Sequence, residues 1–393
     1  MTQTTPHIAF FVTEDWFFLS HRLGIARACR EQGWQVTVSC RINNCREKLE
    51  HESFRLAPLF VKRGSINPIT EVRTLINIYS VLRRHKPDIL HLVGLKMILY
   101  GSIAALLFPR IVVVNAVSGL GTLFTGKQSG KAWLRWTIMR VLRRLLRRRQ
   151  SWVIVQNRDD EELFRALAPA GQTVRIPGVG VNISQFSPAP EPGEPVIAAL
   201  VARMIGEKGI PETIEAARKL RSRGVPIRIR LVGAPDPENP SNVPEEQLLR
   251  WRDEGLVVWN GRSDDIAGVW RASHIVLLPS HREGFPKSLI EGMACARPVV
   301  TTDVIGCRDV IEDGVSGFLV PKDDPDAIAA ALQKLAEDRD LRLRMGAAAR
   351  KRVENLFSDS AIINQTLATF TDAMDHRPDR PDEPPKGDTT LQR

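Results

Sequence analysis

Two glutamates separated by seven residues lie in the stretch HREGFPKSLIEGMACARPVV, residues 281–300. Glu283 follows the apolar run 275–279, and a Gly-Phe-Pro turn then leads into helical text that contains Glu291. Pro286 predicts the start of this helix, because the N–H that proline lacks would be unpaired there in any case. We expect the unpaired N–H groups at that start to favour a phosphate group. Glu291 could accept hydrogen bonds from a diol such as a ribose.

Two cations stand in a similar position earlier in the chain. Arg203 ends the apolar run 196–203, and Lys208 lies five residues later in the loop RMIGEKGI. Arginine and lysine at the carboxyl end of a strand suit a diphosphate. An isolated pair of acids at this spacing would more often be a solvated helix face. The preceding strand, the turn and the two cations instead predict a sugar-nucleotide site.

An alternation of strands and helices along the chain would place these side chains together. In the first half we expect strands at 7–13, 34–39, 88–93, 111–117 and 152–157, with helices at 19–32 and 68–85 among them. In the second half we expect strands at 196–203, 227–233, 257–261, 274–280 and 298–303. This alternation predicts an α/β protein with two doubly wound parallel sheets, whose ligands bind beyond the carboxyl ends of the strands.

The length of 393 residues favours two domains. The sequence SPAPEPGEP at 187–195 has the composition of a linker. We therefore predict four segments: a Rossmann-like first domain, a Rossmann-like second domain, a C-terminal helix that packs back on the first domain, and a disordered tail. Their bounds are 1–188, 189–357, 358–376 and 377–393.

The composition argues against several classes of protein. The five cysteines contain no C-x-x-C pair, which favours a reducing compartment and no structural zinc. The N-terminus lacks the basic start of a signal peptide, and the longest apolar stretch, near 97–108, is too short to span a bilayer. No D-x-D sequence ends a strand, so we expect no bound metal.

The formal net charge of +10 comes almost entirely from residues 127–149, which hold two lysines, seven arginines and no acid. Residues 131–149 form an amphipathic helical pattern. One arc holds Arg140, Arg143, Arg144, Arg147 and Arg148 beside Trp133 and Trp136, and the other holds Leu134, Ile138, Val141, Leu142, Leu145 and Leu146. Arginine with tryptophan on an outer face suits anionic lipid headgroups. A solvated helix packed on its own sheet is the plainer alternative, and nucleic acid is disfavoured because no motif that reads it is present.

The second half resembles the donor domain of the family-4 retaining glycosyltransferases of the GT-B fold. The resemblance rests on Glu283 with Glu291, on Arg203 with Lys208-Gly209, on PGVGVNISQF, and on residues 314–320. The first half resembles the branch that builds bacterial surface glycans on polyprenyl-diphosphate carriers. That looser resemblance rests on FFLSHRLGIARACREQGWQVTV, DILHLVGLKMILYG, NAVSGLGTLFT and VIVQNRDDEELF.

The resemblance implies roles for the matching residues. Arg203 and Lys208 would bind the diphosphate, Glu283 the hydroxyl groups of the transferred sugar, and Glu291 the ribose. The backbone of Gly284, Phe285, Pro286 and Lys287 would bind sugar and phosphate, and the base would lie near Gly261 and Arg262. Transfer would retain the configuration of the sugar without a metal ion.

The acceptor side departs from the family. A Gly-Gly loop that many members carry is replaced by residues 13–16, and a histidine after the strand 111–117 is missing. The polar residues nearest the strand ends are Asp15, His21, His91, Lys96 and Ser118, and a structural role is as plausible for each as contact with the acceptor.

We therefore expect a transferase that uses a UDP-sugar and a lipid-linked glycan acceptor, without nucleic acid, peripheral on the inner face of the cell membrane. Two alternatives remain open. A UDP-sugar epimerase of the same fold would need acids on the first-domain side, of which the sequence offers no clear set. A basic nucleic-acid-binding protein would not need the donor residues.

Overall fold

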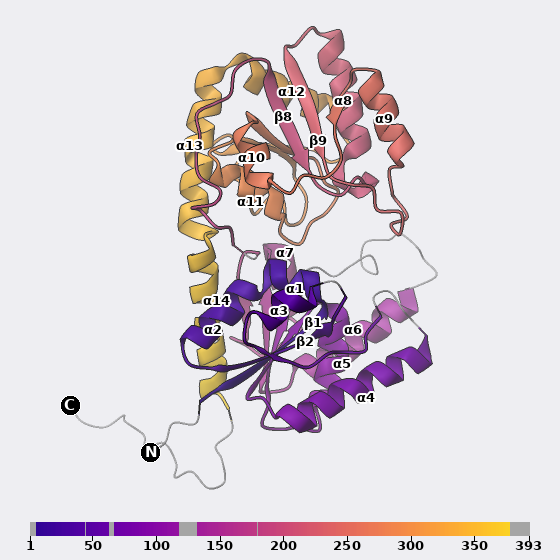
Figure 1. The fold of residues 1–393 in the computed structure, drawn as a ribbon, viewed down its shortest axis with the longest axis vertical. Helices are drawn as coiled ribbons and strands as arrows, with labels where there is room; N and C mark the ends of the chain where they lie inside the picture. The colour runs from indigo at the N-terminus through magenta and orange to yellow at the C-terminus, as the bar shows by residue number, and fades with distance from the viewer. Residues whose placement is uncertain (1–4, 44, 63–66, 118–131, 179, 378–393) are drawn as a thin grey trace, which may run out of the picture.

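The computed structural model describes residues 5–43, 45–62, 67–117, 132–178 and 180–377, without the side chains of 132–135. Two α/β domains are stacked along the long axis of the molecule, and each is built on one parallel sheet (Figure 1). The predicted fold class, two doubly wound parallel-sheet domains, is confirmed.

The first sheet has seven parallel strands. The order across the sheet is β3 (Arg55–Leu56), β2 (Gln35–Arg41), β1 (His7–Glu14), β4 (Ile89–Val93), β5 (Val112–Ala116), β6 (Ser151–Val155) and β7 (Thr173–Arg175). The three strands β4, β5 and β6 are buried along their whole length because helices cover both faces.

One face of this sheet is covered by α1 (Asp15–His21), α2 (Leu23–Glu31) and α14 (Asp359–Asp375). The other face is covered by α4 (Pro68–His85), α5 (Leu95–Ala105) and α6 (Ala132–Leu146). The short helices α3 (Arg46–Glu50) and α7 (Arg158–Arg165) follow β2 and β6.

The single helix predicted at 19–32 is wrong. Arg22 has φ −130° and ψ −11°, outside the helical range, so that α1 ends at His21 and α2 begins at Leu23. The hydrophobic spacing runs through the break, and the sequence therefore did not reveal it.

The second sheet has six parallel strands around one hydrophobic core. Their order is β10 (Val258–Trp259), β9 (Ile227–Val232), β8 (Val196–Val201), β11 (Ile275–Leu278), β12 (Val299–Thr302) and β13 (Gly317–Val320). The helices are η3 (Gly206–Lys208), α8 (Ile210–Ser222), α9 (Glu245–Asp253), α10 (Ile266–Arg271), α11 (Lys287–Ala294), α12 (Pro325–Glu337) and α13 (Arg339–Leu356).

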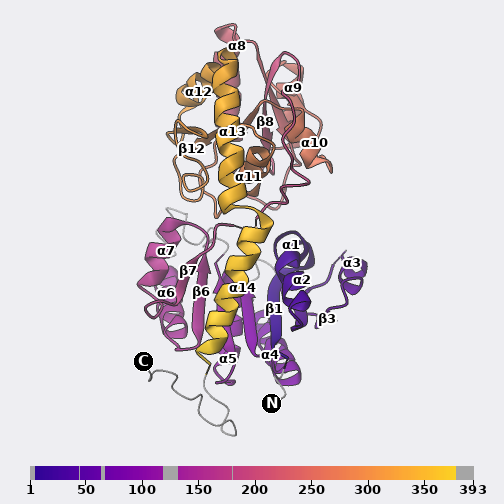
Figure 2. The same ribbon diagram turned by 90° about the vertical axis from the view of Figure 1, so that its left-hand side faces the viewer.

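The chain returns to the first domain at its C-terminal end. Helix α13 runs along the second domain, and α14 continues in nearly the same direction over the first (Figure 2). Ser358 begins α14 by accepting a hydrogen bond from the backbone N–H of Ala361. Phe370 of α14 is fully buried against Phe10 of β1, at a ring-centroid distance of 6.4 Å. The two sheets are thereby joined by a second covalent connection besides the linker.

Candidate active site

Glu283 lies in the loop that leaves β11, and its carboxylate is 12% exposed. Its backbone N–H donates to the carbonyl of Ile305 at 3.0 Å, while the Ser280 hydroxyl donates to its Oε1 at 2.7 Å. The ammonium group of Lys208 pairs with the same oxygen. The structure therefore brings together an acid and a cation that are 75 residues apart in the chain.

The loop that carries Lys208 packs directly on the end of β11. Gly209 has φ +73°, and a side chain at this position would collide with the backbone of Pro279. Only glycine fits such a close approach with a left-handed backbone. Gly209 therefore fixes the distance between the Lys208 loop and the Glu283 loop.

Arg203, the second cation, is 52% exposed and pairs with Asp236. In this structure both predicted diphosphate ligands thus have carboxylate partners. A diphosphate carries more negative charge than a single carboxylate, so it could displace these contacts, and the released carboxylates would need hydrogen-bond donors from the ligand.

Glu291 lies inside α11 and is 9% exposed. Burial raises the pKa of its carboxyl group, and the nearby ammonium group of Lys287, at 3.6 Å, acts in the opposite direction. Pro286 precedes α11, and no side chain caps this helix end. The first N–H groups of α11 and a buried carboxylate one and a half turns away suit phosphate and hydroxyl groups, respectively.

The Gly284–Phe285 segment contacts the first domain. The carbonyl of Gly284 accepts a hydrogen bond from Asn157 Nδ2 at 3.1 Å. The ring of Phe285 lies 5.1 Å from that of Phe357, and a side chain in place of Gly178 would collide with it. Any movement of the two domains relative to each other would therefore change the surroundings of this segment.

Gly261 and Arg262 follow β10 at the edge of the second sheet. The carbonyl of Gly261 accepts a hydrogen bond from the N–H of Gly233, which follows β9, at 2.9 Å. Arg262 is 78% exposed and pairs with Asp264. Both predicted base contacts thus lie just beyond the carboxyl end of β10.

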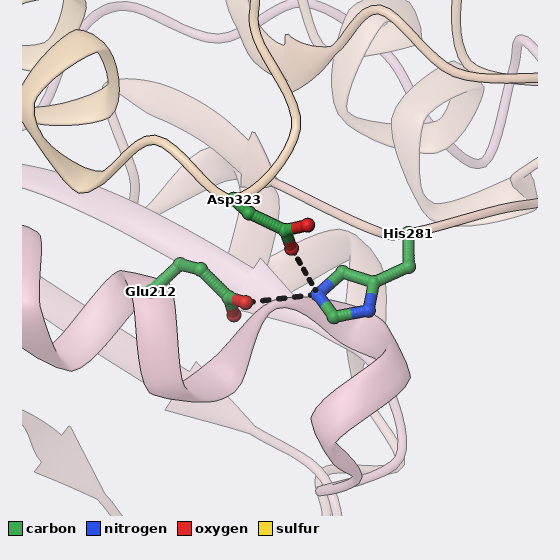
Figure 3. A group of neighbouring side chains, drawn as sticks. All are labelled: Glu212, His281 and Asp323. Carbon is green, nitrogen blue, oxygen red and sulfur yellow. Dashed lines mark hydrogen bonds and ion pairs between the residues drawn. The ribbon is translucent and has the colours of Figure 1, made fainter.

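His281 fixes the start of the Glu283 loop (Figure 3). Its Nε2 faces an oxygen of Glu212 at 2.9 Å and one of Asp323 at 3.3 Å, and its backbone N–H donates to the carbonyl of Glu207. Within the described ranges this trio is the one group of three or more acidic, histidine or cysteine side chains close enough to hold a metal ion. The sequence analysis did not identify it, because its members lie on three separate segments.

A set of ion pairs links α7 to the second domain. Asp159 lies 3.6 Å from Arg308, and Asp160 lies 3.8 Å from Arg282. Burial raises the pKa of the Asp160 carboxyl group, and its hydrogen bond with Asn157 and the charge of Arg282 oppose this shift. The residues lie in the stretch VIVQNRDDEELF, to which the sequence analysis assigned no contact with the second domain.

Two of the acceptor-side candidates lie in α1. Asp15 is 1% exposed and accepts hydrogen bonds from the backbone N–H groups of Trp16, Asn43 and Cys45. His21 stacks on Phe17, and its pKa is lowered to about 3 by burial and by the charges of Arg22 and Lys287. Asp15 thus stabilises a turn. His21 differs from it, because the charge of Lys287 in the second domain contributes to its low pKa.

The other candidates differ from one another. His91 is 1% exposed, and its ring nitrogens have no hydrogen-bond partner among the described residues. Lys96 pairs with Glu71 at 3.0 Å and donates to the carbonyl of Lys62, so it joins α5 to α4. Ser118 lies outside the described residues.

Most of the predicted basic arc is exposed along α6. Arg140, Arg143, Arg144 and Arg147 are exposed, and Trp136 is 60% exposed with Arg140 over its ring at 4.7 Å. Leu142, Leu145 and Leu146 are buried in the core.

Arg148, just after α6, and Val141 of α6 contradict the predicted division into an exposed basic arc and a packed apolar arc. Arg148 turns inward and donates to the carbonyls at the end of α5, where cations satisfy unpaired C=O groups. Val141, predicted on the packed side, is 37% exposed. No described helix is both long enough and apolar enough to cross a bilayer.

Two family comparisons divide the chain where the two sheets do. Residues 7–157 match the family Glycosyl transferase 4-like, and residues 182–352 match the family Glycosyl transferases group 1. The two matched regions contain β1 to β6 and β8 to β13.

Curated relatives are also glycosyltransferases. The capsular polysaccharide biosynthesis glycosyltransferase CapM of Staphylococcus aureus is 34% identical over 42% of this chain, and the match spans only 43% of that relative. The N,N'-diacetylbacillosaminyl-diphospho-undecaprenol alpha-1,3-N-acetylgalactosaminyltransferase of Campylobacter jejuni is 26% identical over 84% of this chain and 91% of its own length.

Solved structures establish the fold. Sucrose-phosphate synthase of Thermosynechococcus elongatus superposes with a TM-score of 0.76 at 23% identity, covering 94% of this chain and 99% of that one. Anabaena Alr3699/HepE, solved with UDP and glucose, superposes with a TM-score of 0.74 at 21% identity, covering 93% and 100%.

Proposed function

The chain belongs to the glycosyltransferases of the GT-B fold, and from this premise we propose that it transfers a sugar from a UDP-sugar to a polyprenyl-diphosphate-linked glycan acceptor. The product would serve a bacterial surface polysaccharide or glycoconjugate. The observation that carries the proposal is the contact of Lys208 with Glu283 beside the start of α11. It brings a cation to a carboxylate in the loop that leads into α11.

The donor would bind across these groups. Lys208 and Arg203 would leave their carboxylate partners for the diphosphate and stabilise the charge that develops on it as the bond to the sugar breaks. Glu283, released from Lys208, would accept hydrogen bonds from the sugar, and Glu291 from the ribose. We propose transfer with retention, in which the acceptor attacks from the side of the departing diphosphate and a phosphate oxygen takes its proton.

We also propose that this reaction needs no metal ion. Two side-chain cations and the N-terminus of α11 can oppose the charge of the diphosphate, which a divalent ion would otherwise do. Glu212, His281 and Asp323 form a separate network, in which the two carboxylates already face one imidazole nitrogen.

The acceptor assignment is supported by relatives. The names of the Campylobacter jejuni protein and of an Escherichia coli relative, 23% identical over 75% of this chain, both specify a sugar linked to diphosphoundecaprenol. Epimerase activity finds no support among the matched families and these relatives, which are transferases.

A lipid-linked acceptor stays in the bilayer, so we propose that the first domain docks on the inner face of the cell membrane. The exposed arginines of α6 and Trp136 suit anionic headgroups. In the same helical layer α4 exposes Ile69, Val72 and Ile76, spaced so that they share one face of the helix. Basic and apolar groups on one layer suit a peripheral attachment.

Measuring the release of UDP distinguishes a glycosyltransferase from an epimerase. We expect slow release from UDP-sugars alone and much faster release when a polyprenyl-diphosphate-linked sugar is added, with the label moving to the lipid. Rapid equilibration of two UDP-sugars without acceptor would indicate an epimerase instead. Stabilisation against heat by a panel of UDP-sugars would identify the donor sugar.

A further inference from the structure

Arg22 lies at the break between α1 and α2 and points into the protein. Its backbone leaves the helical conformation there, and the residue is 5% exposed. The break comes shortly after the carboxyl end of β1, the end of the sheet at which ligands bind in this class of fold. The side chain is therefore buried on the ligand side of the first sheet.

The charge of Arg22 has no acidic partner in the part of the chain that the structure describes. One terminal nitrogen donates to the carbonyl of His21 at 2.9 Å, and the buried Nε makes no hydrogen bond. Burial alone lowers the pKa of the guanidinium group, to about 10, so it remains cationic at neutral pH. A buried charge without a counter-ion is costly.

Two other deeply buried arginines have partners for their guanidinium groups, unlike Arg22. Arg342 is 2% exposed and contacts both carboxylate oxygens of Glu191. Arg297, also 2% exposed, donates to four backbone carbonyls. The chain thus satisfies its other buried guanidinium groups, and Arg22 departs from that rule.

A small cavity joins Arg22 to a second unpaired group. Besides apolar residues, its lining includes Arg22, His91, Gln156 and Thr366. Burial and the charge of Arg22 hold the pKa of His91 well below its usual value, although the nearby backbone of Val114 opposes this shift, so the ring is neutral and one nitrogen carries a proton. Gln156 follows β6, and Thr366 belongs to α14. The Thr366 hydroxyl already donates to the carbonyl of Ile362 at 2.8 Å, so the donors that line the cavity come from three segments, at Arg22, His91 and Gln156.

The neighbouring charges do not supply a counter-ion for Arg22. Burial is the main cause of the low pKa of the adjacent His21, and the charges of Arg22 and Lys287 lower it further. Asp15, the acid close in sequence, is already committed to three backbone N–H groups. The segment 118–131, which lies outside the described residues, contains no aspartate or glutamate. An anion from outside the chain would complete the pairing.

We infer that Arg22, with His91 and Gln156, forms an anion subsite on the first domain that binds a phosphate group of a substrate. The inference rests on the proposed function for the identity of that substrate. Two sources share this chemistry, the diphosphate of the lipid-linked acceptor and the diphosphate of the nucleotide sugar. The fold assigns the subsite to the domain opposite the donor loop.

Arg22→Met tests the subsite, because methionine retains much of the apolar side chain without the charge. A structural arginine would lower the unfolding temperature when lost. Removal of an unpaired buried charge should instead leave the unfolding temperature of the ligand-free protein unchanged or raise it. Arg27→Met is the matched control in the adjoining helix α2, since Arg27 is half exposed and already pairs with Glu52.

Two kinetic arms identify the source of the phosphate. If the acceptor supplies it, Arg22→Met should raise KM for the acceptor by about tenfold or more, as for a lost charge-assisted hydrogen bond, and leave UDP affinity unchanged. If the donor supplies it, UDP affinity should fall instead. Arg22→Lys should restore part of the lost binding in either case. Normal KM for the acceptor and normal UDP affinity in a folded Arg22→Met protein would overturn the subsite.

A measurement without turnover separates this inference from the proposed function. Without any nucleotide present, inorganic pyrophosphate should raise the unfolding temperature of the parent protein more than that of Arg22→Met. Equal shifts would count against the subsite even in an active enzyme. A difference between the two would support it even if no glycosyl transfer were detected.

Discussion

The two domains differ in whether their charged residues near the strand ends have ion-pair partners. At the edge of the second sheet the cations are partly exposed and each has a carboxylate partner, Lys208 with Glu283 and Arg203 with Asp236. On the corresponding side of the first sheet Arg22 and His91 are buried, and neither has a carboxylate partner among the described residues.

This difference indicates two modes of ligand binding. In the second domain a ligand would exchange one set of ion pairs for another, so the empty site is already satisfied and its geometry is held by the protein. In the first domain a ligand would supply hydrogen bonds that the empty protein lacks. Ligand binding should therefore stabilise the first domain more than its number of contacts alone would suggest.

Glu283→Ala should have the largest effect. It removes the carboxylate that contacts the transferred sugar and also leaves Lys208 without its partner. We expect turnover to fall on the order of 10³-fold or more, as when a group that acts only in the transition state is lost. The measurement is kcat with saturating donor and acceptor.

Glu246→Ala is the control for this experiment, because Glu246 lies in the same domain and is 82% exposed. Its kcat should match that of the parent protein. If Glu283→Ala folds and its turnover is near the parent value, Glu283 does not take part in sugar transfer and the donor site proposed in the second domain is wrong.

The donor side could be predicted from the sequence because its residues are close together in the chain. Glu283, Pro286 and Glu291 span nine positions, and the strand, turn and helix around them are local patterns. The parallel sheet order then brings Lys208 to Glu283, since β8 and β11 are neighbours. Recognising the strands was therefore sufficient to place the site.

The first domain could not be predicted in this way. Arg22 and His91 are 69 positions apart, and Gln156 and Thr366 come from still more distant segments. Hydrophobic spacing predicted one helix through Arg22 and gave no indication of the backbone break that turns it inward. The inward turn of Arg148 was missed for a related reason, since a helical arc does not show which arginine caps a neighbouring helix.

Charge reversal on α6 tests the outer face of the first domain. Changing Arg140, Arg143, Arg144 and Arg147 to Glu should release the protein from anionic vesicles, because each basic residue near such a surface contributes about 1 kcal/mol. Arg148 stays unchanged, since it satisfies carbonyls of α5. Binding of the parent protein should fall with salt, because screening acts over about 10 Å at 0.1 M ionic strength.

The matched variant carries four charge reversals on the second domain, at the exposed residues Arg228, Arg250, Arg344 and Lys351. It should still sediment with vesicles. The α6 variant should lose activity on the lipid-linked acceptor far more than on a short soluble analogue. Equal sedimentation of both variants would mean that the domains do not differ in membrane contact.

Glu291 gives a smaller effect with a defined pH dependence. Glu291→Ala should weaken UDP binding by about 1–3 kcal/mol, the loss of one buried partner. Burial raises the pKa of Glu291 in the folded protein, so the carboxylate costs stability above that pKa, and the cost vanishes below the ordinary pKa of glutamate.

The ligand-free Glu291→Gln protein should therefore be more stable than the parent at pH 7, and the difference should shrink as the pH falls toward 4. Thermal unfolding across this range is the measurement. A destabilised Glu291→Gln protein at pH 7 would show that Lys287 pairs with this carboxylate strongly enough to offset its burial.

Removal of divalent ions should have the smallest effect, because the second domain opposes the diphosphate with Lys208, Arg203 and the N-terminus of α11. Turnover after treatment with a chelator should match that of the untreated enzyme, and added magnesium or manganese should not change it.

The network of Glu212, His281 and Asp323 is the place where an ion could nevertheless act, since it fixes the start of the Glu283 loop. Asp323→Asn separates the two explanations, because it removes one charge from the network and leaves the diphosphate ligands untouched. If a chelator abolishes turnover in the parent enzyme and Asp323→Asn has the same effect, the ion belongs to this network. If the chelator acts while Asp323→Asn is fully active and remains sensitive, a metal ion accompanies the diphosphate and the cations of the second domain do not suffice.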